Sequence, residues 1–499
     1  MRQRATFIVK PNTPPTNPEQ FVLSPGSNAY STNNLEVKDL HAAHQEKWTI
    51  ARPDIPPKVW DVLKSLSELH IRWSTPKTYD TINPFSSRVP AGLHIQAAPL
   101  PEENTNELCT LLSSAFSTKP LCKSLNETFI EFPGKRYYLY SNIPEVLGNE
   151  PQQLNEFLKK IVCNGNESCV AEIERLAAPD YIDIDYNSRS LGSRALTISA
   201  FWHRSPEGGE GQWNHKVQQL ADDHRAEVGI LDQRPSLTDG RLTFGGVLTV
   251  LGEDQQLKPT FFSFPARHQQ NSGSYSGSFS DPAGLHPKFL LKIDAAEAPS
   301  EDCTLNAYFS IPKDFFIDKY QLADQQLLES LGLKKLKAFR GEADLEAPTW
   351  TQSRWGSSAL FEVDPKKVDD NGLIDVELPL HMRYQEPGFV SEYTPAKLPW
   401  PAVFWACPAS AEWQQFVVNP FDRGYLGYDV DFPKETAYHH LSPVNGTTYS
   451  TVHVPVLEMK HAPVVKIGTA VVVGVGFLYI VAKILGSVMK KSEPKKKAE

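Results

Sequence analysis

Two Asp-x-Asp pairs are the strongest catalytic candidates in the sequence. Asp183 with Asp185, and Asp429 with Asp431, could hold Mg²⁺ or Mn²⁺ together with the phosphates of a nucleotide sugar. Residues two apart on a strand share one face, so such a pair could act together. However, neither pair lies in the alternating strand and helix pattern typical of nucleotide sites. We therefore predict no catalytic residue here.

Other residue types offer weaker candidates. His439 and His440 have no partner four residues away and no Cys pair at zinc spacing. Residues 273–277, Gly-Ser-Tyr-Ser-Gly, lack the central serine of a nucleophile elbow, and no phosphate loop or dinucleotide fingerprint is present. The sequence predicts neither a cofactor nor a metal.

Strands dominate the elements that would have to position any site. β-branched and aromatic runs recur between turn residues, and 40 Pro in 499 residues favour many turns. The expected strands are 5–9, 69–73, 92–97, 136–140, 181–185, 195–202, 242–251, 303–311, 359–363, 374–384, 402–407 and 448–457. Helical periodicity is confined to 57–69, 152–162, 168–177 and 316–338. The predicted fold class is mainly β.

A Gly- and Ser-rich stretch divides the chain. We predict an amino-terminal β-rich domain over 1–268, a flexible linker or loop over 269–288, and a sandwich-like β domain over 289–463. The net charge of −9 excludes nucleic-acid binding by bulk charge.

A membrane span is predicted at 464–489. Residues 467–482 carry no charge, and the apolar character continues to Met489. The tail 490–499 holds five Lys, which the positive-inside rule places in the cytosol, so the preceding residues would be lumenal. Lys496 and Lys497 resemble a dilysine retrieval signal of endoplasmic reticulum membrane proteins.

The lumenal assignment agrees with three glycosylation sequons, at Asn126, Asn166 and Asn445. Six Cys could form up to three disulfides, with 15 complete pairings that the sequence leaves open. Residues 1–10 show no apolar signal-peptide core, so we expect export through the carboxy-terminal helix or an unrecognised signal.

One motif in the second domain suggests a family. Residues 378–387 contain His381, Arg383, Tyr384 and Pro387, and residues 401–407 follow with Trp405 and Cys407. Together with one carboxy-terminal span and a basic tail, this segment resembles the PIG-X family, in its longer fungal form named for protease B nonderepressible mutants. The resemblance covers about residues 290–485.

That resemblance implies a noncatalytic subunit of glycosylphosphatidylinositol (GPI) mannosyltransferase I in the endoplasmic reticulum membrane. Such a subunit stabilises a multispanning PIG-M-type catalytic chain, which transfers the first mannose from dolichol-phosphate-mannose. The alternative is a general lumenal chaperone or processing factor for secretory and vacuolar proteins such as protease B.

The motif residues have two interpretations. His381, Arg383 and Tyr384 could simply end a strand before the Pro387 turn. Alternatively, strand alternation would place Tyr384 in the core and turn Arg383 outward to a carboxylate or a partner. Trp405 and Cys407 share one strand face, and a disulfide between Cys303 and Cys407 would match a sandwich core.

The sequons and the basic tail together predict the topology. Glycosidase treatment of the protein from cells should increase its gel mobility, because Asn126, Asn166 and Asn445 would face the lumenal glycosylation machinery. A tag on the carboxy terminus should be digested by protease added to intact microsomes. A protected tag combined with an unchanged mobility would invert the topology.

Overall fold

In the computed structural model, the described part of the chain ends at residue 490. Within it, the described residues exclude 12, 14–16, 26–32, 102–104, 117–119, 133–135, 143–151, 164, 166, 168–169, 171–173, 175–177, 189–194, 207–210, 220–222, 236–240, 255, 282, 296, 389–391, 409–418 and 445. The sequons at Asn166 and Asn445, the pair Lys496 and Lys497, and most of the predicted helix 168–177 therefore lie outside it.

An 11-stranded sheet is built from residues 2–265. The strand β1 lies inside this sheet, parallel to β12 and antiparallel to β4. Across the sheet the strands are β14 (Lys258–Pro265), β13 (Arg241–Val250), β12 (Arg225–Arg234), β1 (Arg2–Val9), β4 (Ala42–Ile50), β10 (Leu196–Trp202), β9 (Tyr181–Asn187), β5 (Leu66–Ser74), β6 (Gly92–Pro99), β8 (Tyr138–Asn142) and β7 (Ile130–Glu131).

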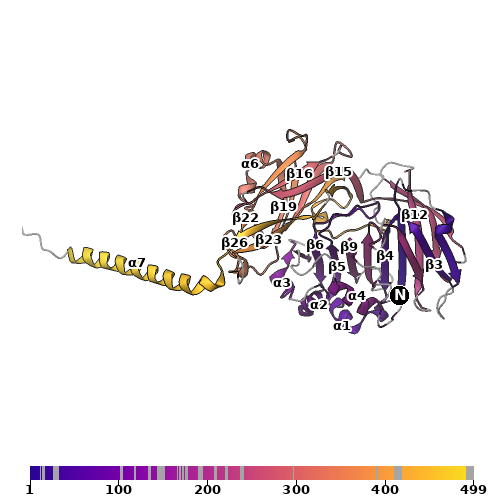
Figure 1. Ribbon diagram of the computed structural model, residues 1–499, viewed down its shortest axis with the longest axis horizontal. Coiled ribbons are helices and arrows are strands. Elements are labelled where there is room, and N and C mark those ends of the chain that lie inside the picture. Colours follow the sequence, from indigo (N-terminus) through magenta and orange to yellow (C-terminus); the bar gives the residue numbers. More distant parts are fainter. Residues whose placement is uncertain are drawn as a thin grey trace, which may run out of the picture.

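The two faces of this sheet differ because side chains alternate along each strand. One face, with Ile71 and Ile184, packs on helices through Leu112 and Leu158 (Figure 1). These helices are α1 (Pro57–Leu63), α2 (Asn106–Phe116) and α4 (Gln152–Leu158), which continues as a π-helix over Lys159–Cys163. A three-stranded sheet, β11 (Trp213–Gln218), β3 (Asn33–Leu40) and β2 (Phe21–Pro25), adds to the same core. The opposite face, which we call the polar face, carries the charged and polar side chains of β5 and β9 and, beside them, an apolar cluster with Ile8, Phe201 and Phe244.

A second sheet of eight strands is built from residues 268–443. Across it lie β19 (Leu333–Gly341), β20 (Gly356–Val363), β17 (Thr304–Pro312), β24 (Ala402–Pro408), β25 (Thr436–Pro443), β15 (His268–Phe279), β16 (Lys288–Asp294) and β21 (Ile374–Pro379). A two-stranded sheet of β23 (Tyr393–Pro399) and β26 (Tyr449–Pro455) shares one core with it through residues such as Leu398 and Val452.

The described residues also form several short elements. They are α3 (Leu125–Thr128), α6 (Gln325–Ser330), the pair β18 (Phe315–Phe316) and β22 (His381–Met382), and the 3-10 turns Pro18–Gln20, Arg52–Asp54, Gln321–Ala323, Thr349–Thr351, Asp429–Asp431 and Met459–His461.

The polar face of the large sheet packs against the second half of the chain. Tyr428 donates from its hydroxyl to the carbonyl of Arg88, at 3.1 Å, and Ser141 donates to Ser310 at 2.9 Å. Val89 of the first half is buried with Tyr308 and Phe404 of the second in one apolar cluster. The two halves therefore bury part of their surfaces against each other.

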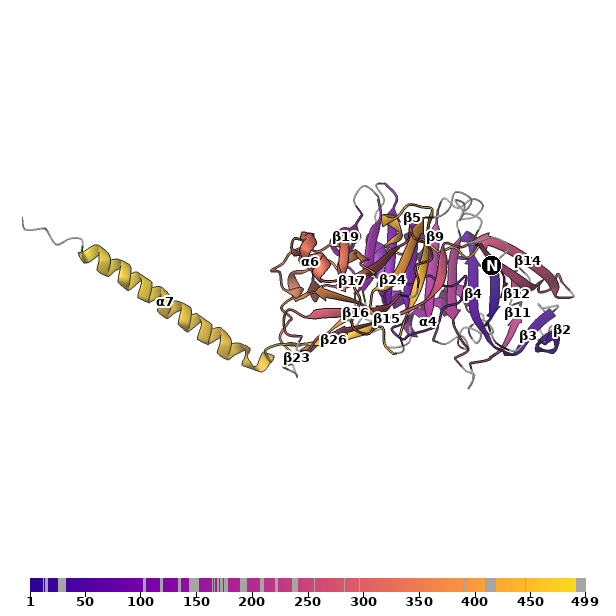
Figure 2. The same ribbon diagram turned by 90° about the horizontal axis from the view of Figure 1, so that it is seen from above.

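The helix α7 (Ala462–Lys490) extends away from this body (Figures 1 and 2). Residues Met459–Val488 have a mean hydropathy of 2.2, and none of this span is buried in the protein. At 1.5 Å per residue, its 29 residues reach about 43 Å, more than the roughly 30 Å of a bilayer core. The mainly β fold class is confirmed, and the carboxy-terminal segment predicted to span a membrane is one apolar helix that is long enough to do so.

The predicted flexible linker over 269–288 is wrong for its first part. Residues His268–Phe279 form β15, which lies between β25 and β16 inside the second sheet. Its small residues serve close packing, since a Cβ on Gly277 would lie 2.5 Å from the Phe289 ring and 3.0 Å from Trp400. The division of the chain near residue 268 stays a prediction.

Two predicted helices are shorter than expected. Over 316–338, only Gln325–Ser330 is α-helical: Asp324 caps its start, and Gly332, with φ of 79°, follows its end. Leu333–Gly341 then pairs with β20 as a strand. The helix predicted over 57–69 ends at Leu63, and Leu66–Ser74 pairs with two neighbouring strands.

Two disulfides join described residues, Cys303 to Cys407 and Cys109 to Cys122. The first closes a segment of 104 residues and the second one of 13. Because longer loops lose more entropy when closed, replacing the first pair by Ala should lower the free energy of unfolding by about 4.7 kcal/mol, and the second by about 3 kcal/mol. Denaturant unfolding of the two double variants measures the difference, and equal losses would contradict the loop-entropy explanation.

Candidate functional site

Asp183 and Asp185 lie on the polar face of β9, and both are engaged by arginines. Arg72 donates from Nε and Nη2 to the two carboxylate oxygens of Asp183, at 2.7 and 2.6 Å. Arg423, from the second half of the chain, contacts Asp183 at 3.3 Å and also pairs with Asp185. The two guanidinium groups occupy the positions beside the carboxylates that a divalent cation would need. Because Arg423 comes from the second half, these ion pairs also connect the two halves of the molecule.

His70 and Glu68 extend this network along β5. His70 donates from Nδ1 to Asp185 at 2.8 Å, and its Nε2 lies 3.7 Å from Glu68. The ring of Tyr425, from the second half, stacks on His70 with centroids 3.5 Å apart. We call Glu68, His70, Arg72, Asp183, Asp185 and Arg423 the buried ion network.

Mutual neutralisation is visible in the pKa values of this network. The nearby His70 lowers the pKa of Glu68 to about 2, assisted by the Tyr137 hydroxyl and opposed by burial. Burial alone would lower the pKa of His70, but its contacts with Asp185 and Glu68 raise it above the ordinary value. Burial likewise opposes ionisation of Asp185, yet Arg423 and His70 hold its pKa below the ordinary value. Each of these shifts favours the charged form of the group relative to the same group in water.

The second Asp pair is also used structurally. Asp429 accepts hydrogen bonds from the backbone N–H groups of Tyr425, Leu426 and Gly427, at 2.7, 3.1 and 3.2 Å. Asp431 pairs with Arg340. Both residues lie in a 3-10 turn, where Asp429 fixes the loop that carries Tyr425.

The motif residues occupy a strand end rather than a continuing strand. Arg383 is 2% exposed, donates to the carbonyl of Ala347 at 2.8 Å and lies 4.6 Å from the centre of the Phe316 ring. Tyr384 is 67% exposed. The prediction that Tyr384 fills the core while Arg383 points outward is wrong, because β22 ends at Met382 and alternation ends with it.

The remaining motif residues lie close by or in the core. His381 stacks on Phe316 and its Nδ1 lies 2.9 Å from that of His286. Pro387 is exposed. Trp405 and Cys407 both point into the second core from β24, and the structure joins Cys407 to Cys303, the pair named from the sequence.

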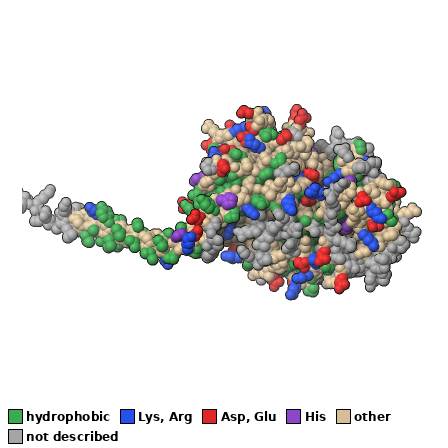
Figure 3. Space-filling view, viewed as in Figure 1, with side chains coloured by type: hydrophobic (Ala, Val, Ile, Leu, Met, Phe, Trp, Pro, Cys, Tyr) green, Lys and Arg blue, Asp and Glu red, His purple; other side chains and the backbone are tan. Residues whose placement is uncertain are grey.

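The segment after the motif reaches the base of α7. Gly388 donates to the carbonyl of Leu457 at 3.1 Å and accepts from the N–H of Met459 at 2.8 Å. Exposed aromatic and apolar side chains gather at this end of the body, as Figure 3 shows beside the start of α7. We define the membrane-proximal surface as Trp350, Tyr384, Tyr393, Leu457 and Met459. Exposed aromatic residues beside the start of an apolar helix are typical of a membrane interface or of a contact with a membrane partner.

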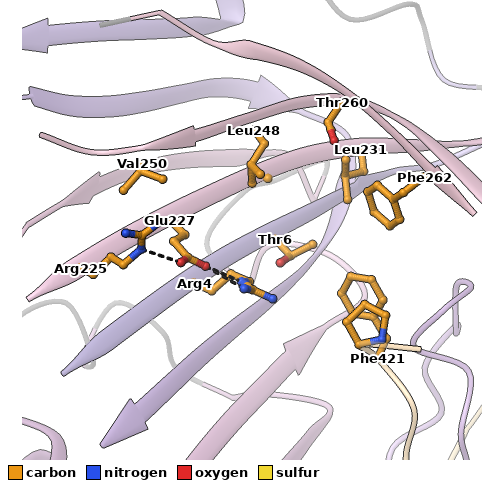
Figure 4. A pocket seen from close by; sticks show the side chains of 12 residues that line it. Arg4, Thr6, Arg225, Glu227, Leu231, Leu248, Val250, Thr260, Phe262 and Phe421 are labelled. Atoms are coloured by element: carbon orange, nitrogen blue, oxygen red, sulfur yellow. Dashed lines mark hydrogen bonds and ion pairs between the residues drawn. The ribbon is translucent and has the colours of Figure 1, made fainter. Parts of the chain in front are cut away.

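A pocket of about 350 Å³ opens at the other end of the body (Figure 4). Glu227 lies on its wall and pairs with Arg4 and Arg225, each at 2.8 Å. Leu248, Phe262 and Phe421 form apolar walls. Its charged groups satisfy one another, so the pocket presents mainly apolar surface.

Asn126 is exposed on α3, as a glycosylation site must be. Sequence reasoning missed Arg72, His70 and Arg423. These residues lie 111, 115 and 238 positions from the Asp residues they contact, and no local spacing signals such pairs. The Asp183-x-Asp185 spacing was the only part of the ion network visible in the sequence.

Comparison with known proteins gives consistent matches. A family model described as PIG-X / PBN1 matches residues 282–485. Protein pbn1 of Emericella nidulans is 36% identical over 493 residues, covering 92% of this chain and 90% of that protein. Protein pbn1 of Neurospora crassa is 32% identical over 517 residues, covering 100% and 98%. The similarity thus includes the amino-terminal half, beyond the 290–485 expected from the motif.

The buried ion network should be costly to break. Met is apolar and similar in length to Arg, so Arg423→Met removes the positive charge with little change in side-chain length. Asp183 and Asp185 then lack one counter-charge, which should lower the free energy of unfolding by about 3 to 5 kcal/mol. Lys38→Met is the matched control, because its pair with Glu36 is about half exposed and should change stability by under about 1 kcal/mol. Denaturant unfolding measures both, and equal losses would show that the network does not hold the halves together.

Proposed function

The chain belongs to the PIG-X/PBN1 family, and on that premise we propose that it is the noncatalytic subunit that stabilises the catalytic chain of GPI mannosyltransferase I. The family acts in GPI-anchor biosynthesis. The partner would be a PIG-M-type chain that transfers the first mannose from dolichol-phosphate-mannose.

The single candidate span among the described residues supports an accessory role. A dolichol-linked donor requires a reaction site at or within the bilayer, where polar groups must be shielded from lipid. One helix has no second helix to enclose such a site. A multispanning partner would supply the site, and α7 would place the body of this chain beside it.

The acidic pairs support the same assignment. Asp183 and Asp185 are neutralised by Arg72 and Arg423, while Asp429 caps a loop. A metal-dependent glycosyl transfer through either pair would first have to remove these partners. In the structure, the Asp residues and their partners hold the two halves of the chain together.

The observation that carries the proposal is the exposure of Tyr384 at the base of the membrane helix. This motif residue is 67% exposed although it follows directly on the buried Arg383. Its backbone carbonyl accepts from the N–H of Thr349 at 3.0 Å and from the hydroxyl of Thr349 at 3.1 Å, which fixes the backbone of Tyr384 next to the turn Thr349–Thr351. Within α7, Ala470 and Gly474 are one turn apart and leave room for close approach of a partner helix.

We place the body in the lumen of the endoplasmic reticulum and the Lys-rich tail in the cytosol. The tail follows α7 directly, and the exposed Asn126 lies on the opposite side of the span in the chain. In this orientation the membrane-proximal surface faces the lumenal leaflet, where the lumenal loops of a multispanning partner would be within reach.

Replacing Tyr384 by Ala should lower the steady-state amount of the catalytic chain severalfold, because a stabiliser acts through the assembled fraction. Mannose transfer per unit of catalytic chain should stay unchanged. Phe261→Ala is the matched control: Phe261 is 60% exposed on β14, at the end of the body far from α7 (Figure 2). Quantitative immunoblotting and transferase assays in microsomes measure both quantities.

Two outcomes would contradict the proposal. A fall in transfer per catalytic chain at unchanged abundance would mean that this chain contributes to the chemistry. Unchanged abundance and transfer, together with defective maturation of a vacuolar protease, would favour the alternative role as a lumenal chaperone or processing factor.

A further inference from the structure

Three potential metal ligands meet in the interior of the amino-terminal half. His44 and Glu46 are two residues apart on β4, so both side chains leave the same face of the 11-stranded sheet. His215 comes from β11 in the three-stranded sheet. One ligand atom from each residue lies within 4.8 Å of the other two. These atoms therefore meet between two sheets, far from the buried ion network on the opposite face.

Two of these atoms have no hydrogen-bond partner. The side chains of His44 and Glu46 are 0% exposed, and Nε2 of His44 lies 3.0 Å from Oε2 of Glu46 in a geometry that makes no hydrogen bond. Leaving a carboxylate oxygen buried and unpaired is costly. A positive charge close to both atoms would remove this cost.

The surroundings orient both side chains toward the same point. Nδ1 of His44 lies 3.2 Å from the backbone carbonyl of Thr6 and can only donate to it, so in the neutral ring Nε2 carries the lone pair. Gln3 donates to Oε1 of Glu46 at 2.7 Å, which leaves Oε2 free to ligate. Such contacts to a second atom of each ligand are typical of bound metals.

Aromatic rings enclose the cluster and hold its histidines in place. The Phe7 ring stacks on His44 with centroids 4.2 Å apart, and Trp213 meets the same ring edge-on at 4.8 Å. Trp213 is anchored in turn by its Nε1–H, which donates to the carbonyl of Ala42 at 2.9 Å. An apolar shell of this kind lowers the local dielectric constant and so strengthens the attraction between a cation and a carboxylate, while a water molecule can complete the coordination.

We propose that His44, Glu46 and His215 bind a zinc ion. Two imidazoles and one carboxylate are a known zinc ligand set, with bonds of about 2.0 to 2.2 Å and donor atoms about 3.4 Å apart. The ligand atoms of the three residues already lie within 4.8 Å of one another, and binding would draw them together to that value. The ion would tie β4 of the large sheet to β11 of the small one, independently of the proposed membrane partner.

A proton is the competing occupant. If His44 were doubly protonated, it would form a buried ion pair with Glu46 without any metal. The two possibilities differ in stoichiometry and in the need for His215, since the ion pair would persist without that residue.

The full-length chain, purified in detergent from cells grown with zinc, tests the proposal through its metal content. Plasma mass spectrometry should find about one zinc per wild-type chain after dialysis, because three protein ligands hold the ion. Glu46→Gln and His215→Gln, close in size to the original residues, should each retain under about a tenth of this amount. His453→Gln, an exposed histidine on β26, is the control and should keep all of it.

Cobalt substitution of the wild-type chain tests the site directly, even if a ligand variant folds poorly. Wild-type chain stripped of metal and loaded with Co²⁺ should show the strong visible absorption of a four-coordinate site, and the bands should weaken in proportion to loss of zinc in the variants. Wild-type chain without zinc and without these bands would overturn the proposal in favour of the protonated pair. Zinc that persists in both ligand variants would overturn it by showing that the metal binds elsewhere.

Discussion

The body of this protein depends on four charges, two buried and two partly buried, that the chain brings together from three distant segments. Arg72, Asp183 and Asp185 lie on the polar face of the first sheet, and Arg423 arrives from the second half. Removing such charges from water costs several kcal/mol each, and the cost is offset only when every partner is present. Each half therefore supplies charges that are stable only beside the other half. This requirement accounts for the charged side chains that are buried on this sheet face, and for the loop of Tyr425, which Asp429 caps.

The sequence predicted what depends on local pattern and missed what depends on distant partners. Runs of β-branched and aromatic residues identified strands such as Tyr181–Asn187, which was predicted over 181–185, and the uncharged run identified α7. The helix predicted over 316–338 is mostly wrong because Leu333–Gly341 pairs with β20 as a strand. The contacts made in the sheet outweigh the helical periodicity of this segment. The Gly- and Ser-rich stretch looked flexible but forms β15, whose small residues let Phe289 and Trp400 pack closely. Arg383 is buried and Tyr384 is exposed, the reverse of the expectation from alternation, because β22 ends at Met382, just before both residues. Asp183 and Asp185 were identified as a pair, but their arginines, more than 100 residues away along the chain, were not.

The two ends of the body differ in the side chains that they expose, and in the proposed function each end has a different role. The end that carries α7 exposes Trp350, Tyr384 and Tyr393, while the far end holds the pocket beside Glu227 and the three-stranded sheet with His215. A rigid connection between the ends follows from the buried ion network and from the cluster around Tyr428. An accessory subunit built in this way can hold a membrane partner at one end while its stability is set by interactions elsewhere. The proposed zinc ion would belong to that second group, because it joins two sheets of the amino-terminal half.

Depletion of this chain followed by lipid analysis tests the proposed role most directly. In depleted cells, the unmannosylated glucosaminyl-inositol lipid should accumulate, because the catalytic chain is lost when its partner is absent. Extra copies of the catalytic chain should reverse the accumulation, since a stabiliser can be compensated by mass action. Accumulation that persists at a restored level of catalytic chain would contradict the stabilising role and assign this protein a direct part in the transfer itself.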